Sequence, residues 1–133
     1  MIEYADVNSL YSSVAWKYQF PIGIPESVVN KPRLSTIEIK NGEMLFENQP
    51  VIGIAHVSIL PSFSLFPFLI QRVENKVYGA CCNTCLRNKS TRICKHSDTQ
   101  RTITGIYTIS EIVFAVEKCG YKLIEVHEIM AYR

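Results

Sequence analysis

The first segment whose residue types could do chemistry is Tyr4-Ala5-Asp6-Val7-Asn8-Ser9-Leu10-Tyr11. The carboxylate of Asp6 ends a predicted strand over residues 1–6, and a polar Asn-Ser step and the phenol of Tyr11 follow it. A carboxylate at a strand end, beside a tight turn, is suited to hold a hard cation and the phosphates that the cation carries. An ordinary strand whose last Asp caps a helix explains the same residues, because Asp and Ser are both favoured N-caps.

The second such segment, residues 81–96, carries four of the five cysteines. Cys82 and Cys85 form a C-x2-C pair, and Cys94 and His96 form a C-x-H pair after eight intervening residues. Three thiolates and one imidazole match the ligands of a tetrahedral structural zinc site, which we therefore predict, with Cys81 as a substitute ligand. The alternative is a set of reduced cysteines that coordinate nothing.

Length and composition describe one globular domain. The chain has 133 residues, 47% of them hydrophobic and 20% charged, and its net charge of +2 is too small to indicate nucleic-acid binding by itself. No apolar run approaches the roughly 20 residues of a membrane helix, so no membrane partner is expected. An odd number of cysteines without a secretory signal favours metal binding and an intracellular, reducing compartment, which could be the cytoplasm, nucleus or mitochondrion.

The elements that must position these residues make an α+β pattern. A helix is predicted over residues 9–16, a connector over 26–32, and a hairpin turn at Asn41-Gly42. A helix capped by Ser110 and ended at Gly120 precedes the last strand, and it carries Cys119 on its apolar face. The further strands are predicted at residues 33–40, 43–47, 51–60, 69–72, 76–80, 102–109 and 121–132.

The segment from Asp6 to Tyr11 resembles the D-x-x-S-L-Y-P motif of family B DNA polymerases, called motif A, with Ser12 in place of the proline. Residues 18–25 (YQFPIGIP) resemble the Y-P-x-G-x-P segment of the protein-primed branch, which includes viral and Maverick/Polinton-type polymerases. The Cys/His segment and the segments 102–111, 117–121 and 125–128 resemble later parts of that branch in the same order. Motif A is specific, whereas the later segments are individually loose.

The resemblance implies a division of the chain and a mechanism. Residues 1–32 would be a palm fragment with motif A, and residues 33–133 a β-rich insertion that holds the Cys/His loop and one C-terminal helix. Asp6 would bind catalytic Mg²⁺, assisted by the carbonyl of Val7, in a two-metal nucleotidyl transfer. The amides near Ser9 and Leu10 would contact the triphosphate, and Tyr11 would pack under the sugar and exclude ribonucleotides.

The same resemblance implies the partners: primer–template DNA, a dNTP, a terminal priming protein and the rest of a polymerase chain. The basic residues predicted to lie near DNA phosphate are Arg87, Lys89, Arg92, Lys95 and Arg101. A solvated basic loop is the alternative interpretation of these five side chains.

The resemblance also has limits. The chain contains neither the K-x3-N-S-x-Y-G segment nor the D-T-D segment of the family, so we expect a piece of a longer protein that is inactive alone. The alternatives are a stand-alone zinc-bearing module that binds DNA or protein, and a relic without function. His56 is predicted to be an ordinary sheet histidine, and His127 to be polar decoration of a strand that could pair with Glu125.

Overall fold

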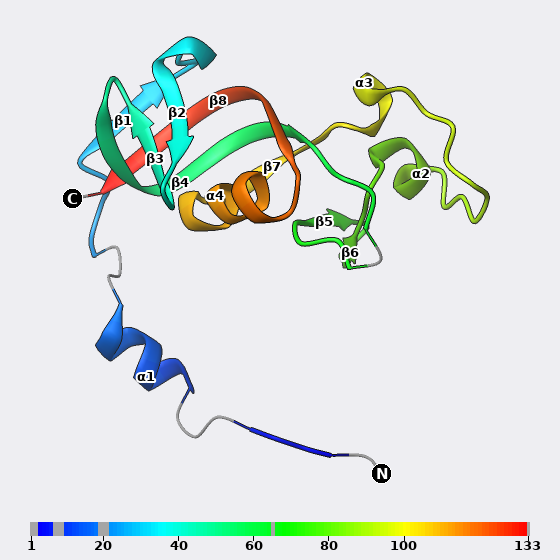
Figure 1. Ribbon diagram of the computed structural model, residues 1–133, viewed down its shortest axis with the longest axis horizontal. Coiled ribbons are helices and arrows are strands. Elements are labelled where there is room, and N and C mark those ends of the chain that lie inside the picture. Colours follow the sequence, from blue (N-terminus) through cyan, green and yellow to red (C-terminus); the bar gives the residue numbers. More distant parts are fainter. Residues whose placement is uncertain (1–2, 7–9, 19–21, 65, 133) are drawn as a thin grey trace.

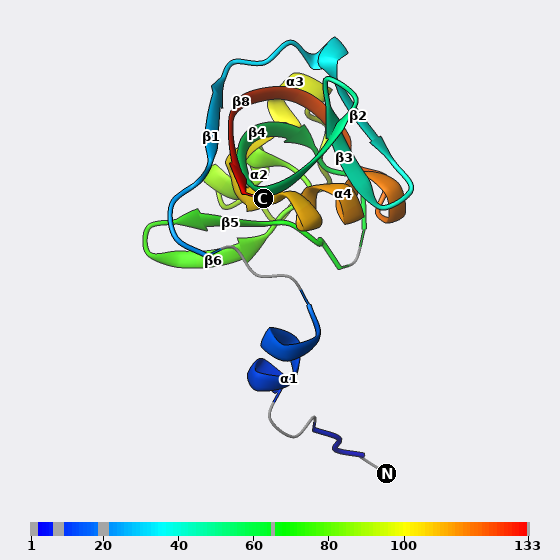
Figure 2. The ribbon, with the colours of Figure 1, turned by 90° about the vertical axis from the view of Figure 1, so that its left-hand side faces the viewer.

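The computed structural model describes residues 3–6, 10–18, 22–64 and 66–132. The helices and strands, in chain order, are α1 (Leu10–Lys17), β1 (Ser27–Asn30), the 3-10 turn η1 (Leu34–Thr36), β2 (Ile37–Lys40), β3 (Glu43–Phe46), β4 (Gln49–Leu60), β5 (Ile70–Val73), β6 (Lys76–Gly79), α2 (Asn83–Arg87), α3 (Asp98–Arg101), β7 (Ile103–Thr108), α4 (Ile109–Lys118) and β8 (Lys122–Tyr132). The predicted α+β class is confirmed. Helix α1 lies apart from the sheet, as Figures 1 and 2 show.

The long strand β4 is the centre of a six-stranded antiparallel sheet. Its one edge pairs with β8 from Ile52 to Leu60, while its other edge pairs first with β3 and then with β7. Strand β1 extends the sheet beyond β8, and β2 extends it beyond β3. The strand predicted over residues 51–60 thus becomes β4, which pairs directly with β3, β7 and β8 and connects through one neighbour to β1 and β2.

Two hairpins turn through residues with positive φ: one joins β2 to β3 in the six-stranded sheet, and the other joins β5 to β6, which form a separate two-stranded sheet. Asn41 and Gly42 have φ values of 52° and 77°, which confirms the predicted turn between β2 and β3. Glu74 and Asn75 make the turn between β5 and β6 with φ values of 50° and 66°. Such turns match the right-handed twist of the strands that they join.

The core lies between the sheet and α4, which packs across β2, β3, β4 and β7. Helix residues Ile112 and Ala115 are fully buried, and so are Val57 and Ile59 of β4. Gly53 brings β8 close to β4, because a Cβ at that position would lie 2.0 Å from the carbonyl oxygen of Met130. Cys119, which the sequence predicts on the apolar face of this helix, is partly buried and packs against the core.

Several predicted boundaries were wrong. Residues 3–6 are extended but form no strand, because no neighbouring strand pairs with them in the described part of the chain. The predicted connector contains β1, which pairs with β8 through contacts such as Val29 with Ile129. Helix α4 is capped by Thr108, whose hydroxyl accepts a hydrogen bond from the Glu111 amide at 3.2 Å, rather than by Ser110.

The other predicted elements lie close to their observed positions. Helix α1 agrees with the prediction for residues 9–16, with Ser9 outside the described residues. The predicted strand at 33–40 is shortened to β2 by the 3-10 turn η1. None of the helices in the described ranges has both the length and the apolarity that crossing a bilayer requires.

The β5–β6 hairpin and the Cys/His loop form the end of the molecule opposite β1–β3 (Figure 1). The side chain of Gln71 on β5 is buried and donates to the Tyr107 hydroxyl at 2.7 Å and to the Thr104 carbonyl at 3.0 Å. The Tyr107 hydroxyl in turn donates to the Ile70 carbonyl at 2.7 Å. These bonds attach the hairpin to β7 and therefore place it beside the loop.

Candidate functional site

Four side chains of the Cys/His loop converge, and they are the four that the sequence predicts. The ligand atoms of Cys82, Cys85, Cys94 and His96 all lie within 4.8 Å of one another. Among the residues that the structure describes, no other group of three or more Cys, His, Asp or Glu side chains converges in this way. The Cys81 sulfur instead points to the Ser64 carbonyl at 3.4 Å and stays outside the cluster.

Two short helices hold the cluster in place. Cys82 caps α2, and its sulfur accepts a hydrogen bond from the Cys85 amide at 3.4 Å, as expected of a C-x2-C turn. Ser97 caps α3 directly after His96, and its capping box with Gln100 ends the loop. The Thr84 hydroxyl donates to the Gln100 carbonyl at 2.8 Å, which links α2 to α3.

The distances fit a tetrahedral metal centre. The Nδ1 atom of His96 lies 3.4 Å, 3.2 Å and 3.5 Å from the sulfurs of Cys82, Cys85 and Cys94. A zinc ion with usual bond lengths separates its sulfur and nitrogen ligands by about 3.6 Å. The residues therefore have the number, type and spacing that a structural zinc ion requires, and a bound ion would supply a fixed cross-link rather than a reactive group.

The protonation of the cluster without a cation differs from thiol to thiol. Burial, together with the neighbouring thiols of Cys94 and Cys82, raises the pKa of Cys85 to about 12. A hydrogen bond from the His96 backbone lowers the pKa of Cys94 to about 7. At neutral pH Cys85 therefore keeps its proton. A thiolate at Cys85 would lie close to the other sulfurs of the cluster and would need a positive ion to balance its charge.

Zinc binding by this cluster is expected to weaken as the pH falls. Because the metal binds thiolates, the proton on Cys85 must leave at any pH below about 12, and the proton on Cys94 must also leave below about 7. The logarithm of the binding constant should then rise by at least about one per pH unit from pH 7 to 9 and more steeply below pH 7. Competition with a chromophoric chelator across this range measures the slope, and a binding constant independent of pH would contradict the thiolate assignment.

The residues of the predicted nucleotide site lie in a separate, exposed part of the chain. Asp6 precedes α1, and Tyr11 in its first turn is 89% exposed. Trp16 on the same helix is 90% exposed. Val7 and Ser9 lie outside the described residues, so the geometry around them stays a prediction.

The basic residues predicted to contact DNA divide into two groups. Arg87, Lys89, Arg92 and Lys95 are exposed on the Cys/His loop. Arg101 is only 6% exposed, and its guanidinium donates to the Pro61 carbonyl at 2.6 Å and the Cys81 carbonyl at 3.3 Å. Arg101 therefore links the Cys/His loop to the segment that follows β4, because its guanidinium can donate to several carbonyls at once. The sequence did not indicate this structural role.

The histidines on the sheet are polar and partly buried. His127 Nε2 lies 2.8 Å from the Ser58 hydroxyl, and its Nδ1 lies 3.7 Å from the Glu125 carboxylate. The ring of His56 packs 4.8 Å from that of His127. The predicted proximity of Glu125 and His127 is thus observed, and the contact with Ser58, 69 residues away, arises only from the pairing of β4 with β8.

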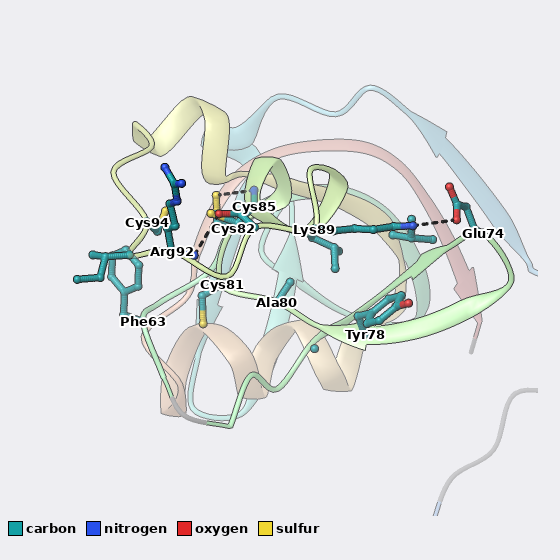
Figure 3. Close-up of a pocket in the computed structure, with 15 residues that line it drawn as sticks. Phe63, Glu74, Tyr78, Ala80, Cys81, Cys82, Cys85, Lys89, Arg92 and Cys94 are labelled. Carbon is teal, nitrogen blue, oxygen red and sulfur yellow. Dashed lines mark hydrogen bonds and ion pairs between the residues drawn. The ribbon is translucent and has the colours of Figure 1, made fainter.

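A cavity of about 870 Å³ lies beside the cluster, between the Cys/His loop and the β5–β6 hairpin (Figure 3). Its walls include the sulfur-bearing residues Cys82, Cys85 and Cys94, together with Phe63 and Tyr78. Its volume falls in the range of small-molecule and cofactor sites. The sequence gives no direct signal of this cavity, because its walls come from separate segments.

The fold and the cluster define a β-rich domain whose loop carries three cysteines and one histidine able to hold a metal ion, preceded by a helix and by a segment with one carboxylate. A sequence model of the family described as DNA polymerase type B, organellar and viral, matches residues 1–133. The chain therefore belongs to this family of DNA polymerases. No curated protein and no solved structure matches the chain.

Proposed function

We propose that the chain is the motif A part of a protein-primed family B DNA polymerase, joined to the insertion that follows this motif. The observation that carries the proposal is the family match over all 133 residues, with Asp6 and Tyr11 in the motif A order. The Pro21-Ile22-Gly23-Ile24-Pro25 segment supports the protein-primed branch, because it resembles the segment that follows motif A there.

In this proposal Asp6 ligates Mg²⁺ and orients the triphosphate of the incoming dNTP. Attack of a primer hydroxyl, or of a hydroxyl on a terminal priming protein, on the α-phosphorus needs its entering and leaving oxygens stabilised by positive charge. Tyr11 would set the preference for deoxyribonucleotides. The exposed apolar side chains of α1, such as Trp16, would pack against the rest of the polymerase, since isolated proteins rarely leave so many exposed together.

The body from β1 to β8 serves as a folded insertion beside this catalytic segment. Zn²⁺ on Cys82, Cys85, Cys94 and His96 would cross-link α2 to the segment before α3, in place of an apolar core that this loop lacks. The exposed Arg87 and Lys95 would then face DNA phosphate. A zinc-thiolate site fits a reducing compartment such as the cytoplasm, nucleus or mitochondrion.

Primer extension tests the proposal in two arms. The purified 133-residue chain with Mg²⁺, primer–template DNA and dNTPs is expected to incorporate no nucleotide, because it lacks the K-x3-N-S-x-Y-G and D-T-D segments. A longer polymerase that contains these 133 residues and those segments is expected to extend the primer. Incorporation by the short chain, or a fully assembled polymerase without activity, would contradict the proposal.

The second candidate function is a stand-alone zinc-bearing module that binds DNA or protein. It is favoured by the fact that the sheet and α4 share a core of their own, from which α1 stands apart. Strong nucleic-acid binding by the short chain, together with inactivity of every longer assembly, would select this function over the first.

A further inference from the structure

The cavity beside the Cys/His loop has walls that suit flat apolar groups. Phe63 and Tyr78 lie toward its two ends in Figure 3, with Ala80 between them. The Arg101 guanidinium lies 3.8 Å from the centroid of the Phe63 ring and so holds that ring in place from one side. Phe63 is nevertheless 67% exposed, and Tyr78 is 38% exposed, so both rings are accessible from the solvent.

Each aromatic ring of the cavity has a cation near it. Figure 3 shows Arg92 on the side of Phe63, and Lys89 on the side of Tyr78. The one carboxylate among the described lining residues belongs to Glu74, which pairs with Lys89 at 3.5 Å. Both partners of this pair are well exposed, so the pair contributes little stability and an incoming anion can replace Glu74.

The chain around the cavity is strongly one-sided in charge. Residues 75–97 contain five lysines and arginines and no aspartate or glutamate. Even a zinc ion bound to three thiolates would add only one negative charge, so the segment stays clearly positive. A neutral apolar peptide would gain nothing from this charge, whereas a polyanion with flat apolar groups would use both the rings and the cations.

We propose that this cavity binds a short unpaired stretch of nucleic acid, with bases stacked on Phe63 and Tyr78 and phosphates against Arg92 and Lys89. Bases in a duplex are stacked on one another and cannot enter such a cavity, so the site selects single strands. The choice of DNA rather than RNA rests on the proposed polymerase function. The stacking and charge arguments are independent of that function. The insertion would thereby hold DNA that is not paired with its complement.

Fluorescence anisotropy on the zinc-loaded 133-residue chain tests this site. The probes are a labelled eight-nucleotide oligo-dT and a labelled DNA hairpin duplex. Oligo-dT is expected to bind about tenfold more tightly than the duplex, and Phe63→Ala and Tyr78→Ala are each expected to weaken its binding about tenfold. Phe66→Ala is the matched control, because Phe66 is 86% exposed, lies three residues from Phe63 and does not line the cavity.

Charge variants provide a second readout. Lys89→Gln and Arg92→Gln are each expected to weaken oligo-dT binding and to reduce the salt dependence by about 0.7 in the logarithmic slope. Glu74→Gln is expected to strengthen binding about threefold, because it removes the one carboxylate that the described lining residues contribute and releases Lys89. A gain of affinity cannot result from misfolding, so this variant separates a binding role from a structural one.

The proposal is overturned if oligo-dT does not bind, if the duplex binds equally well, or if Phe66→Ala weakens binding as much as Phe63→Ala. A protein ligand for the cavity would produce the first of these results. The outcome is independent of the polymerase proposal: Asp6→Asn should leave oligo-dT binding unchanged, because Asp6 lies outside the cavity. Primer extension can therefore fail while the cavity binds, and the cavity can fail while primer extension succeeds.

Discussion

Replacement of Cys85 by serine is expected to abolish tight zinc binding, with a loss of affinity of about a thousandfold or more. Cys85 is one of four ligands within 4.8 Å of one another, and its sulfur lies 3.2 Å from His96 Nδ1. A serine hydroxyl is a much poorer zinc ligand than a thiolate, and three remaining ligands leave the tetrahedral site incomplete. Metal analysis after exposure to a chelator measures the loss, with about one zinc per wild-type chain as reference.

The structural effect of Cys85→Ser should stay within the Cys/His loop and α3. Helices α2 and α3 have five and four residues, too few to persist without a cross-link, whereas the sheet and α4 have a buried core of their own. Hydrogen exchange should therefore accelerate in residues 82–101 of Cys85→Ser and change little in β4 and β8. Unfolding of the whole chain on loss of zinc would contradict this division.

Cys81→Ser is the matched control for this experiment. Cys81 is adjacent to Cys82 in sequence, but its sulfur contacts the Ser64 carbonyl rather than the cluster. The control should retain one zinc and the exchange pattern of the wild type. Equal loss of zinc in Cys81→Ser and Cys85→Ser would show that Cys81 also coordinates the metal, and the ligand set would then have to be revised.

Replacement of Asp6 by asparagine in a complete polymerase that contains this chain is expected to reduce primer extension about a thousandfold or more. Under the proposed function Asp6 ligates the Mg²⁺ that neutralises charge on the reacting phosphate, and an amide cannot replace that negative ligand. The expected loss corresponds to about 4 kcal/mol of transition-state stabilisation. Single-turnover incorporation of one dNTP measures it without interference from product release.

Glu3→Gln serves as the control for Asp6→Asn. Glu3 is an exposed carboxylate three residues earlier on the same segment, and motif A assigns it no role. It should leave the incorporation rate within about twofold of the wild type, as is usual for surface substitutions away from a site. Similar losses in both variants, or full activity in Asp6→Asn, would remove Asp6 from the catalytic metal site.

Much of the local structure followed from residue patterns alone. The β-branched run after Pro50 predicted most of β4, Asn41-Gly42 predicted a hairpin, and the apolar face that contains Ile112 predicted α4. These predictions succeeded because helix and strand periodicity and turn chemistry act over a few residues. The described residues 3–6 of the strand predicted at 1–6 form no strand, because a strand needs hydrogen-bonded neighbours that local sequence does not specify.

The residues of the Cys/His cluster were selected from the sequence, whereas the surroundings of the cluster depend on the tertiary structure. Types and spacing were enough to select Cys82, Cys85, Cys94 and His96, because all four lie within 15 consecutive residues and a short loop can bring them together. The choice between Cys81 and Cys82 was left open, and only the fold directs the Cys81 sulfur to Ser64.

The sequence by itself thus determined which residues form the Cys/His cluster, most of the strands and the motif A order of Asp6 and Tyr11. Only the tertiary structure shows that Arg101 is buried and links the Cys/His loop to Pro61, and that Phe63 and Tyr78 line one cavity. It also decided that Ser58 and His127 meet across β4 and β8. The physical reason is distance along the chain: these pairings depend on how strands and loops pack together, which no spacing of residue types within a short segment encodes.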